Sequence, residues 1–263
     1  MADIGKLMIF DTHAHYDDAK FDPDRQEILD AMQAHGIGRI INVSSDFPSW
    51  ARTIALTEEY DFIYGALGIH PSDIDGLNEE RFAWMAEQLA LDKILAVGEI
   101  GLDYYWEKDP EVRKRQKYWF RRQFELAKEK NMPVIIHSRE AAQDTVELLE
   151  ELHAEKIPVV IHCYSYTPEM AERFLKMNCW FGIGGVVTFK NAKKLQETVK
   201  MLPEDKILLE TDCPYLSPEP NRGKRNSSFN LSYVAEKIAQ LRGISAEEVI
   251  RMTEKNAEQF YGI

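Results

Sequence analysis

The sequence has 263 residues, of which 44% are hydrophobic and 29% charged, and its formal net charge is −12. This length suits one large α/β domain, and the acidic balance argues against a protein that coats nucleic acid or anionic membranes, because such binding depends on Lys and Arg. A cytoplasmic protein is expected, because no apolar stretch approaches the roughly 18 residues of a membrane span, the N-terminus lacks signal-peptide features, and three cysteines do not suggest a disulfide framework.

Eight short apolar runs, each followed by a helical pattern, succeed one another along the chain. The runs predict strands at 6–10, 39–44, 63–69, 94–100, 133–137, 158–162, 179–185 and 206–212. The helical patterns cover 24–36, 49–60, 79–91, 111–131, 141–156, 167–178, 192–202, 230–243 and 245–262. The runs are nearly continuous in apolar residues, as parallel strands covered on both faces require. The pattern predicts an α/β fold, a (β/α)8 TIM barrel forming a single domain over residues 1–263. An open doubly wound sheet is less favoured, because no Gly-rich phosphate loop follows the first run.

Potential metal ligands stand at the ends of most of these runs. In chain order they are His13, His15, His70, Glu99, His137, His162 and Asp212. A lone His at a strand end is usually a structural residue, but the carboxyl ends of all barrel strands meet in one mouth. Several imidazoles and carboxylates buried together without a cation would be hard to stabilise. The sequence therefore predicts a metal site at this mouth.

Six of these residues suit two divalent cations better than one, because a single catalytic zinc takes three protein ligands. His13 and His15 are expected to bind the first cation, and His137 with His162 the second. Glu99 is predicted to bridge the cations. Asp212 is expected to bind the first cation or to act on its water, so that Glu99 and Asp212 are the candidate catalytic residues. With these two carboxylates counted, the site would carry a charge of about +2 and attract a phosphate. Imidazole ligands suit Zn, Mn, Co or Ni, and Mg less well.

Other side chains are candidates for substrate binding. His70 is expected either to bond a phosphate oxygen or to be a structural residue before a turn, and Arg139 is expected to point into the mouth. Arg222 and Arg225 belong to a basic loop after the eighth run, where barrel enzymes often hold phosphate. Three aromatic residues at 104–106 could stack on a base or pack over a helix.

Cysteines and acids near the predicted ligands are interpreted as supporting residues. Cys163 and Cys213 each follow a ligand directly, so strand alternation predicts that they point away and pack in the core. Asp11 is expected to support the ligands from behind or to end the strand. Asp17 and Asp18 lie in the loop toward the first helix and are not expected to be ligands.

Seven segments together resemble the TatD family of metal-dependent hydrolases. They are FDTHAH, GIHP, AVGEIGLDYY, PVIIHSREA, VIHCYS, GGVVTFKNA and LLETDCPYLSPEPNRGKRN. The resemblance runs from about residue 8 to the C-terminus and implies an amidohydrolase-like TIM barrel, deoxyribonuclease activity, and metal ligands at the same six residues. After RGKRN the family usually continues with an acid and a proline, whereas this sequence has SSF. The departure concerns the shape of the last loop rather than the metal site.

The predicted function is therefore hydrolysis of phosphodiester bonds in DNA by a two-metal centre. The acidic chain favours exonuclease-type processing of ends or short single strands, with no obligate protein partner and no membrane partner. One alternative is cleavage of a carboxylic ester or amide, for example in aminoacyl-tRNA. Glu99 is less compatible with the amide-cleaving relatives, which bridge their metals through a modified lysine on the fourth strand. A metal-binding but inactive scaffold is the second alternative, and the intact set of six ligands argues against it.

Overall fold

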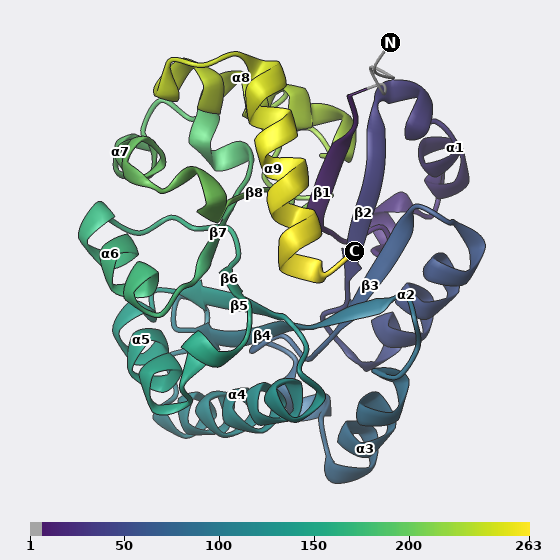
Figure 1. Cartoon of the computed structure of the whole chain (residues 1–263). Coiled ribbons are helices and arrows are strands. Elements are labelled where there is room, and N and C mark those ends of the chain that lie inside the picture. Colours follow the sequence, from purple (N-terminus) through teal and green to yellow (C-terminus); the bar gives the residue numbers. More distant parts are fainter. Residues whose placement is uncertain (1–6) are drawn as a thin grey trace.

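The computed structural model describes residues 7–263, which form eight parallel strands paired in the order β1 to β8 (Figure 1). Their bounds are β1 Ile9–Ala14, β2 Ile37–Val43, β3 Ile63–Leu67, β4 Ile94–Asp103, β5 Val134–Arg139, β6 Val159–Ile161, β7 Trp180–Ile183 and β8 Ile207–Leu209. The segment after β8 returns to β1 through a parallel bridge between Ala14 and Cys213. The sheet is thereby a nearly closed barrel, which confirms the predicted TIM-barrel fold.

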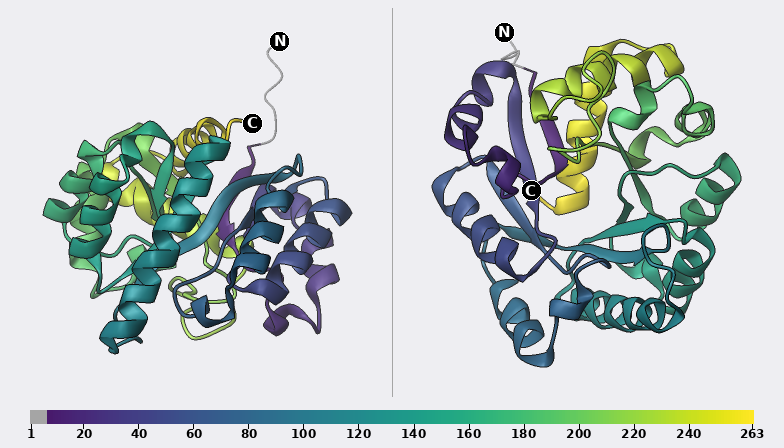
Figure 2. Two further views of the ribbon diagram at one scale, coloured as in Figure 1. Left: turned by 90° about the horizontal axis from the view of Figure 1, so that it is seen from below. Right: turned by 180° about the vertical axis from the view of Figure 1, so that it is seen from behind.

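Helices follow the strands and surround the barrel, as the two further views show (Figure 2). Their bounds are α1 Arg25–Asp30, α2 Phe47–Glu59, α3 Glu79–Gln88, α4 Pro110–Lys130, α5 Ala142–Glu151, α6 Pro168–Lys176, α7 Lys193–Met201, α8 Leu231–Arg242 and α9 Ala246–Tyr261. Local sequence fixes where several begin. Asp46 and Ser49 form a capping box at α2, and Ser245 and Glu248 form another at α9, which satisfies backbone N–H groups at the helix start. Within residues 7–263, none of the helices is both long and apolar enough to span a membrane.

The last helix, α9, lies across one end of the barrel (Figure 1). Its Phe260 packs against Trp180 at the start of β7, with ring centroids 5.6 Å apart. Tyr261 stacks on Phe10 near the start of β1. These contacts bury apolar rings at the amino ends of the strands, which stabilises the barrel. The opposite end, where the strands have their carboxyl ends, is therefore the open one.

Several element boundaries differ from the sequence-based prediction. The first strand was expected at 6–10, of which Lys6 lies outside the described residues, but β1 runs from Ile9 to Ala14 and includes His13. Its pairing with β2 shifts register between Asp11 and Ala14, a bulge that bends the strand. Strand β4 extends to Asp103 because it stays paired with β5. The first helix is shorter than predicted and ends at Asp30.

A candidate metal centre

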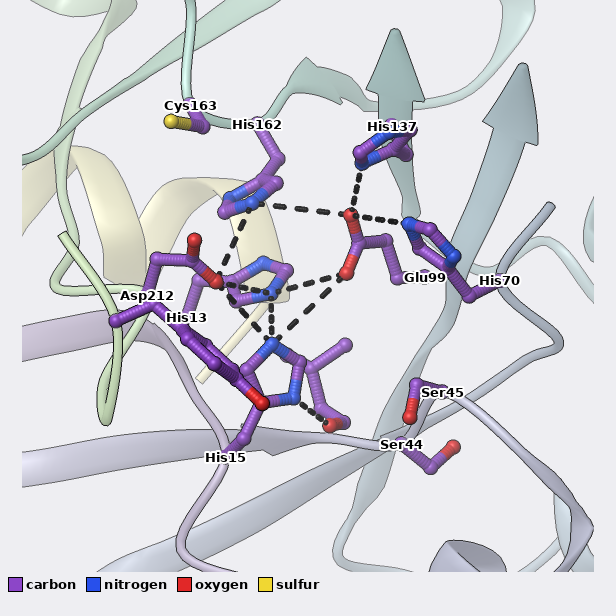
Figure 3. A network of polar contacts seen from close by, with 12 residues as sticks. His13, His15, Ser44, Ser45, His70, Glu99, His137, His162, Cys163 and Asp212 are labelled. Carbon is purple, nitrogen blue, oxygen red and sulfur yellow. Dashed lines mark hydrogen bonds and ion pairs between the residues drawn. The ribbon is translucent and has the colours of Figure 1, made fainter. Parts of the chain in front are cut away.

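Six predicted ligands from five strands converge at the carboxyl end of the barrel (Figure 3). His13 Nε2 and His15 Nε2 are 3.1 Å apart. Asp212 Oδ1 lies 3.3 Å from His15 Nε2 and 3.9 Å from His13 Nε2. The imidazole and carboxylate atoms of these three residues are mutually within 4.8 Å, close enough to hold one ion. His13 lies in β1, and His15 follows directly after Ala14, the last residue of that strand.

Glu99 stands between two groups of histidines, with one carboxylate oxygen toward each. Its Oε2 is 3.4 Å from His13 Nε2 and 3.9 Å from His15 Nε2. Its Oε1 is 2.7 Å from His137 Nδ1 and 3.7 Å from His162 Nε2. A carboxylate oriented in this way can bridge two cations, each approached by two imidazoles.

The outward nitrogens of His15 and His137 have hydrogen-bond acceptors, and that of His162 lies close to a carboxylate without a hydrogen bond. His15 Nδ1 donates to the carbonyl oxygen of Val43 at 2.6 Å. His162 Nδ1 lies 3.1 Å from Glu210 Oε1, and His137 Nε2 lies 3.2 Å from Asp103 Oδ2. Acceptors behind metal-binding histidines fix both the tautomer and the ring orientation.

Asp103 and Glu210 are functional residues that the sequence reasoning missed. The signal that could have found them is strand alternation. Glu210 precedes Asp212 by two residues, and Asp103 follows Glu99 by four, so each carboxylate has the even spacing from a predicted ligand that alternation would place on one face.

Two glycines create the close packing that the site needs. A Cβ on Gly182 of β7 would lie 2.0 Å from Glu210 Oε2, so only glycine leaves room for this buried carboxylate. Glu210 Oε1 also accepts a hydrogen bond of 2.6 Å from the Cys163 N–H. Gly101 has a φ of +149°, and a Cβ there would lie 1.9 Å from the carbonyl oxygen of His137. Strands β4 and β5 approach closely enough to align their ligands only because this side chain is absent.

The donor set fits divalent cations. Burial opposes ionisation of Glu99, but His162 and the hydrogen bonds from His13 and His137 outweigh it and hold the Glu99 pKa well below its usual range. Burial likewise opposes protonation of His15 and His162, yet carboxylates beside them raise their pKa values to about 9 and about 10. Without a cation, the imidazoles of His15 and His162 are therefore protonated on the nitrogen that faces Glu99 and Asp212. Cations can replace such protons, because neutral imidazole and ionised carboxylate are the metal-binding forms.

The structure adds two carboxylates to those counted in the charge expected of this centre. That expectation counted Glu99 and Asp212 only. Asp103 and Glu210 lie directly behind two of the imidazoles, and four carboxylates balance two divalent cations. With two divalent cations bound, the centre would therefore have no net charge, and nearby hydrogen-bond donors would have to contribute to the attraction of a phosphate.

A cavity of about 890 Å³ opens above the predicted ligands. Its walls include His70 and Arg139, two of the predicted substrate-binding residues, and Trp106, one of the aromatic residues expected either to stack on a base or to pack over a helix. Arg52 of α2 also lines the cavity, and no role was predicted for it. Its acidic lining residues are Asp17, Asp18, Asp46, Asp73, Glu99, Asp103 and Asp212. The rim is therefore predominantly acidic, and phosphate contacts are confined to a few positions.

His70 lies beside Glu99 and His137, and one atom from each of these three residues falls within 4.8 Å of the other two, close enough to hold an ion. His70 Nδ1 accepts the N–H of Ser72 at 3.1 Å, so in the neutral ring the proton sits on Nε2. Burial, together with neighbouring His137, lowers the His70 pKa to about 3, so the ring is neutral. Its Nε2 lies 3.9 Å from Glu99 Oε1, where an N–H can reach an oxygen of a bound phosphate.

The structure does not bring Arg222 and Arg225 to this cavity. Arg225 forms two hydrogen bonds with Asp24, of 2.8 and 2.5 Å, and lies over the ring of Phe21. Arg222 lies over Phe189, 4.2 Å from the ring centroid. Neither arginine lines the cavity, because the basic loop folds back against neighbouring segments.

The position of Cys163 differs from the prediction that it points away from the ligands into the core. Cys163 lines the cavity next to His162 and Asp212, whereas alternation had placed it on the opposite side. The strand ends at Ile161, and Cys163 has a φ of +46°, so the two-residue period no longer applies there. Cys213, by contrast, is fully buried, as expected.

Asp11 supports the ligands from behind by joining β1 to the segment after β8. Its Oδ2 accepts hydrogen bonds from Thr211 Oγ1 at 2.7 Å and Ser228 Oγ at 2.6 Å. Ser228 belongs to the SSF segment that departs from the family pattern, so this departure contributes a bond at the barrel seam. Asp17 lines the cavity but accepts from Asn42 Nδ2 at 2.8 Å, which holds it apart from the ligands.

Comparison with known proteins identifies similar chains over the whole barrel. The family model described as TatD related DNase matches residues 10–262. The chain is 46% identical to the uncharacterized metal-dependent hydrolase YabD of Bacillus subtilis, over 97% of this chain and 100% of the relative. It is 34% identical to the human deoxyribonuclease TATDN3, over 96% and 94% of the two chains. The crystal structure of YjjV, a TatD homolog from Escherichia coli, superposes with a TM-score of 0.91 at 30% identity, over 98% and 100% of the chains.

Proposed function

Because the chain belongs to the TatD family of metal-dependent hydrolases, we propose that it is a deoxyribonuclease with two divalent cations at the carboxyl end of its barrel. The observation that carries this proposal is the orientation of Glu99, whose Oε2 faces His13 and His15 and whose Oε1 faces His137 and His162. A two-cation centre suits phosphodiester hydrolysis, because the attacking and leaving oxygens can be stabilised together.

The ligands divide between two positions. His13 Nε2, His15 Nε2 and Asp212 Oδ1 would hold the first cation. His137 Nδ1 and His162 Nε2 would hold the second, each with its outward nitrogen on a carboxylate. These cations, when bound, lower the pKa of water and neutralise charge on phosphoryl oxygens.

The protein's own groups account for proton movement and orientation. Asp212 faces the histidines with Oδ1, so its Oδ2 can accept the proton of the attacking water. Hydrogen bonding from His15 and charge from the imidazoles outweigh burial and lower the Asp212 pKa, so the carboxylate is ionised and ready to accept. His70 Nε2–H donates to a non-bridging phosphate oxygen, and Arg139 contacts a neighbouring phosphate. As the water oxygen bonds to phosphorus, the bond to one ester oxygen of the DNA breaks.

The cavity favours ends and short strands over long duplex DNA. Its acidic rim offers few cations, and the chain as a whole carries a net charge of −12. Binding of long nucleic acid depends on many Lys and Arg contacts to phosphates. A cavity of about 890 Å³ suits an exonuclease-type reaction on one terminal segment.

The direct test is incubation of the purified, metal-reconstituted protein with end-labelled single-stranded and double-stranded DNA across Zn, Mn, Co, Ni and Mg. We expect shortened products with at least one metal, and no products from a Glu99→Gln variant that retains the fold. Turnover of DNA by Glu99→Gln at the wild-type rate would contradict the two-cation mechanism.

One observation favours a second candidate, an ester hydrolase acting on aminoacyl-tRNA. The acidic rim could pair with the ammonium group of an aminoacyl ester, which DNA lacks. Release of amino acid from aminoacyl-tRNA, without any cleavage of DNA under the same metal conditions, would favour this candidate over the nuclease.

A further inference from the structure

The aromatic side chain of Trp106 stands at the edge of the candidate metal centre with much of its ring in solvent. It lies three residues after the end of β4, lines the cavity, and is 69% exposed. The adjacent Tyr105 is 41% exposed, and the two rings meet edge to face with centroids 4.7 Å apart. Isolated exposed aromatics are common on surfaces, but Trp106 borders the cavity that holds the candidate ligands, and Tyr105 packs against it.

The segment that carries these rings is held firmly in place. Asp103 Oδ1 accepts hydrogen bonds from the N–H groups of Tyr105 at 2.9 Å and Trp106 at 3.0 Å. Lys108 Nζ donates to the carbonyl oxygen of Tyr104 at 2.6 Å. The exposed side chain of Trp106 is therefore presented by a backbone that hydrogen bonds hold in one conformation. A ring presented in this way binds a ligand without a large ordering cost.

A cation accompanies the aromatic rings. The Arg139 guanidinium lies over Tyr105, 4.1 Å from its centroid, and 5.6 Å from that of Trp106. Arg139 and Arg52 are the two arginines that line the cavity. An exposed aromatic face beside a guanidinium group is the combination that binds a nucleobase and its adjacent phosphate in single strands.

We infer that Trp106 is a stacking platform for a nucleobase next to the scissile phosphate, with Arg139 on the neighbouring phosphate. This inference rests on the proposed nuclease function and specifies its substrate as a single-stranded end. A paired base inside a duplex has both faces covered, whereas an unpaired base can place one face on the indole. Stacking also supplies affinity that an acidic cavity cannot obtain from charge, and it tolerates any base because every base has a π-face.

The test crosses enzyme variants with substrate variants. The substrates are a short single-stranded DNA and matched strands in which one terminal nucleotide at a time, at either end, is replaced by a tetrahydrofuran abasic residue. The enzymes are the metal-loaded wild type, Trp106→Ala and Trp106→Phe. Tyr118→Ala serves as a matched control, since Tyr118 is a 48% exposed aromatic on α4 that does not line the cavity.

For the intact strand we expect Trp106→Ala to lower kcat/KM about tenfold, a loss typical of one base–aromatic stack. Trp106→Phe should retain most of the activity, and Tyr118→Ala all of it. When the abasic residue replaces the base that stacks on Trp106, the kcat/KM of the wild type should fall by the same factor of about ten. On that abasic strand, Trp106→Ala should have the same kcat/KM as the wild type.

Two results would overturn the inference while the nuclease function stands. One is an unchanged kcat/KM for Trp106→Ala on the intact strand, and the other is an equal loss on intact and abasic strands, which would mark Trp106 as a structural residue. If the wild type cleaves none of the strands with any metal, the nuclease proposal fails first and the stacking platform fails with it.

Discussion

Substitution of Gly182 by alanine tests how the carboxylate behind His162 supports the metal centre. The new Cβ would stand 2.0 Å from Glu210 Oε2, although Cβ atoms essentially never approach closer than 3.0 Å. Glu210 must therefore move by about 1 Å. Such a shift breaks its 2.6 Å hydrogen bond from the Cys163 N–H and its 3.1 Å contact with His162 Nδ1.

The expected loss of stability combines the cost of overpacking with the loss of the hydrogen bond from the Cys163 N–H. Overpacking of a close-packed interior costs about 1–3 kcal/mol, and loss of a hydrogen bond to a charged acceptor costs about 1.5–3 kcal/mol. Because partial relaxation lowers the sum, we expect Gly182→Ala to lower the free energy of unfolding by about 2–4 kcal/mol. Misorientation of His162 should also weaken metal binding by about 10–100-fold.

Denaturant unfolding of the metal-free protein and titration calorimetry with the metal measure the two effects separately. Gly65→Ala is the matched control, because its Cβ would lie 2.5 Å from Ile94 Cδ1 in β4, away from the candidate ligands. It should lower stability and leave metal affinity unchanged. In a Glu210→Ala background the obstructing carboxylate is gone, so Gly182→Ala should cost almost nothing more. Additive losses in that double variant, or normal metal affinity in Gly182→Ala, would refute the reasoning.

Four further outcomes are expected. Glu99→Gln should abolish turnover and bind fewer than two metal ions per chain by elemental analysis, whereas a full metal complement would exclude Glu99 as the bridge. Asp103→Asn should weaken metal binding about 10–100-fold, because the amide is a poorer acceptor behind His137, and unchanged affinity in calorimetry would contradict this role. Removal of metal by a chelator should lower the Tm, since a cation at 100 times its Kd stabilises the fold by about 2.7 kcal/mol, and an unchanged Tm would contradict a built metal site. Arg225→Met should leave kcat/KM unchanged, because Arg225 is paired with Asp24 outside the cavity, and a large rise in KM would restore it as a phosphate contact.

The fold was predictable because each strand–helix unit carries its own local signal. The near-continuous apolar run at Val134–Ile136, for example, is buried on both sides in the structure. Convergence of the ligands then followed from topology alone, since barrel strands share one carboxyl end. His13 and His162 are 149 positions apart in the chain, yet their rings stack with centroids 3.5 Å apart.

What the sequence could not supply were features decided by tertiary packing. Cys163 escaped the alternation rule because its backbone adopts a positive φ just beyond β6. Arg225 was expected to bind phosphate, but it pairs with Asp24, which comes from a segment about 200 positions away. The local sequence pattern does not predict the backbone conformation of Cys163 or the partner of Arg225, because both depend on how distant segments meet when the barrel closes.

Asp103 links the candidate metal centre to the candidate stacking platform. One of its oxygens faces His137 Nε2, and the other holds the backbone of Trp106. A single buried carboxylate thus sets the position of a ligand and of an exposed indole relative to each other. Catalysis requires reacting atoms to be placed within a fraction of an ångström, and a base stacked on a mobile loop would not meet this requirement. If both proposals hold, the carboxylate that would help to balance the charge of the cations would also fix the distance between the bound base and the reacting phosphate.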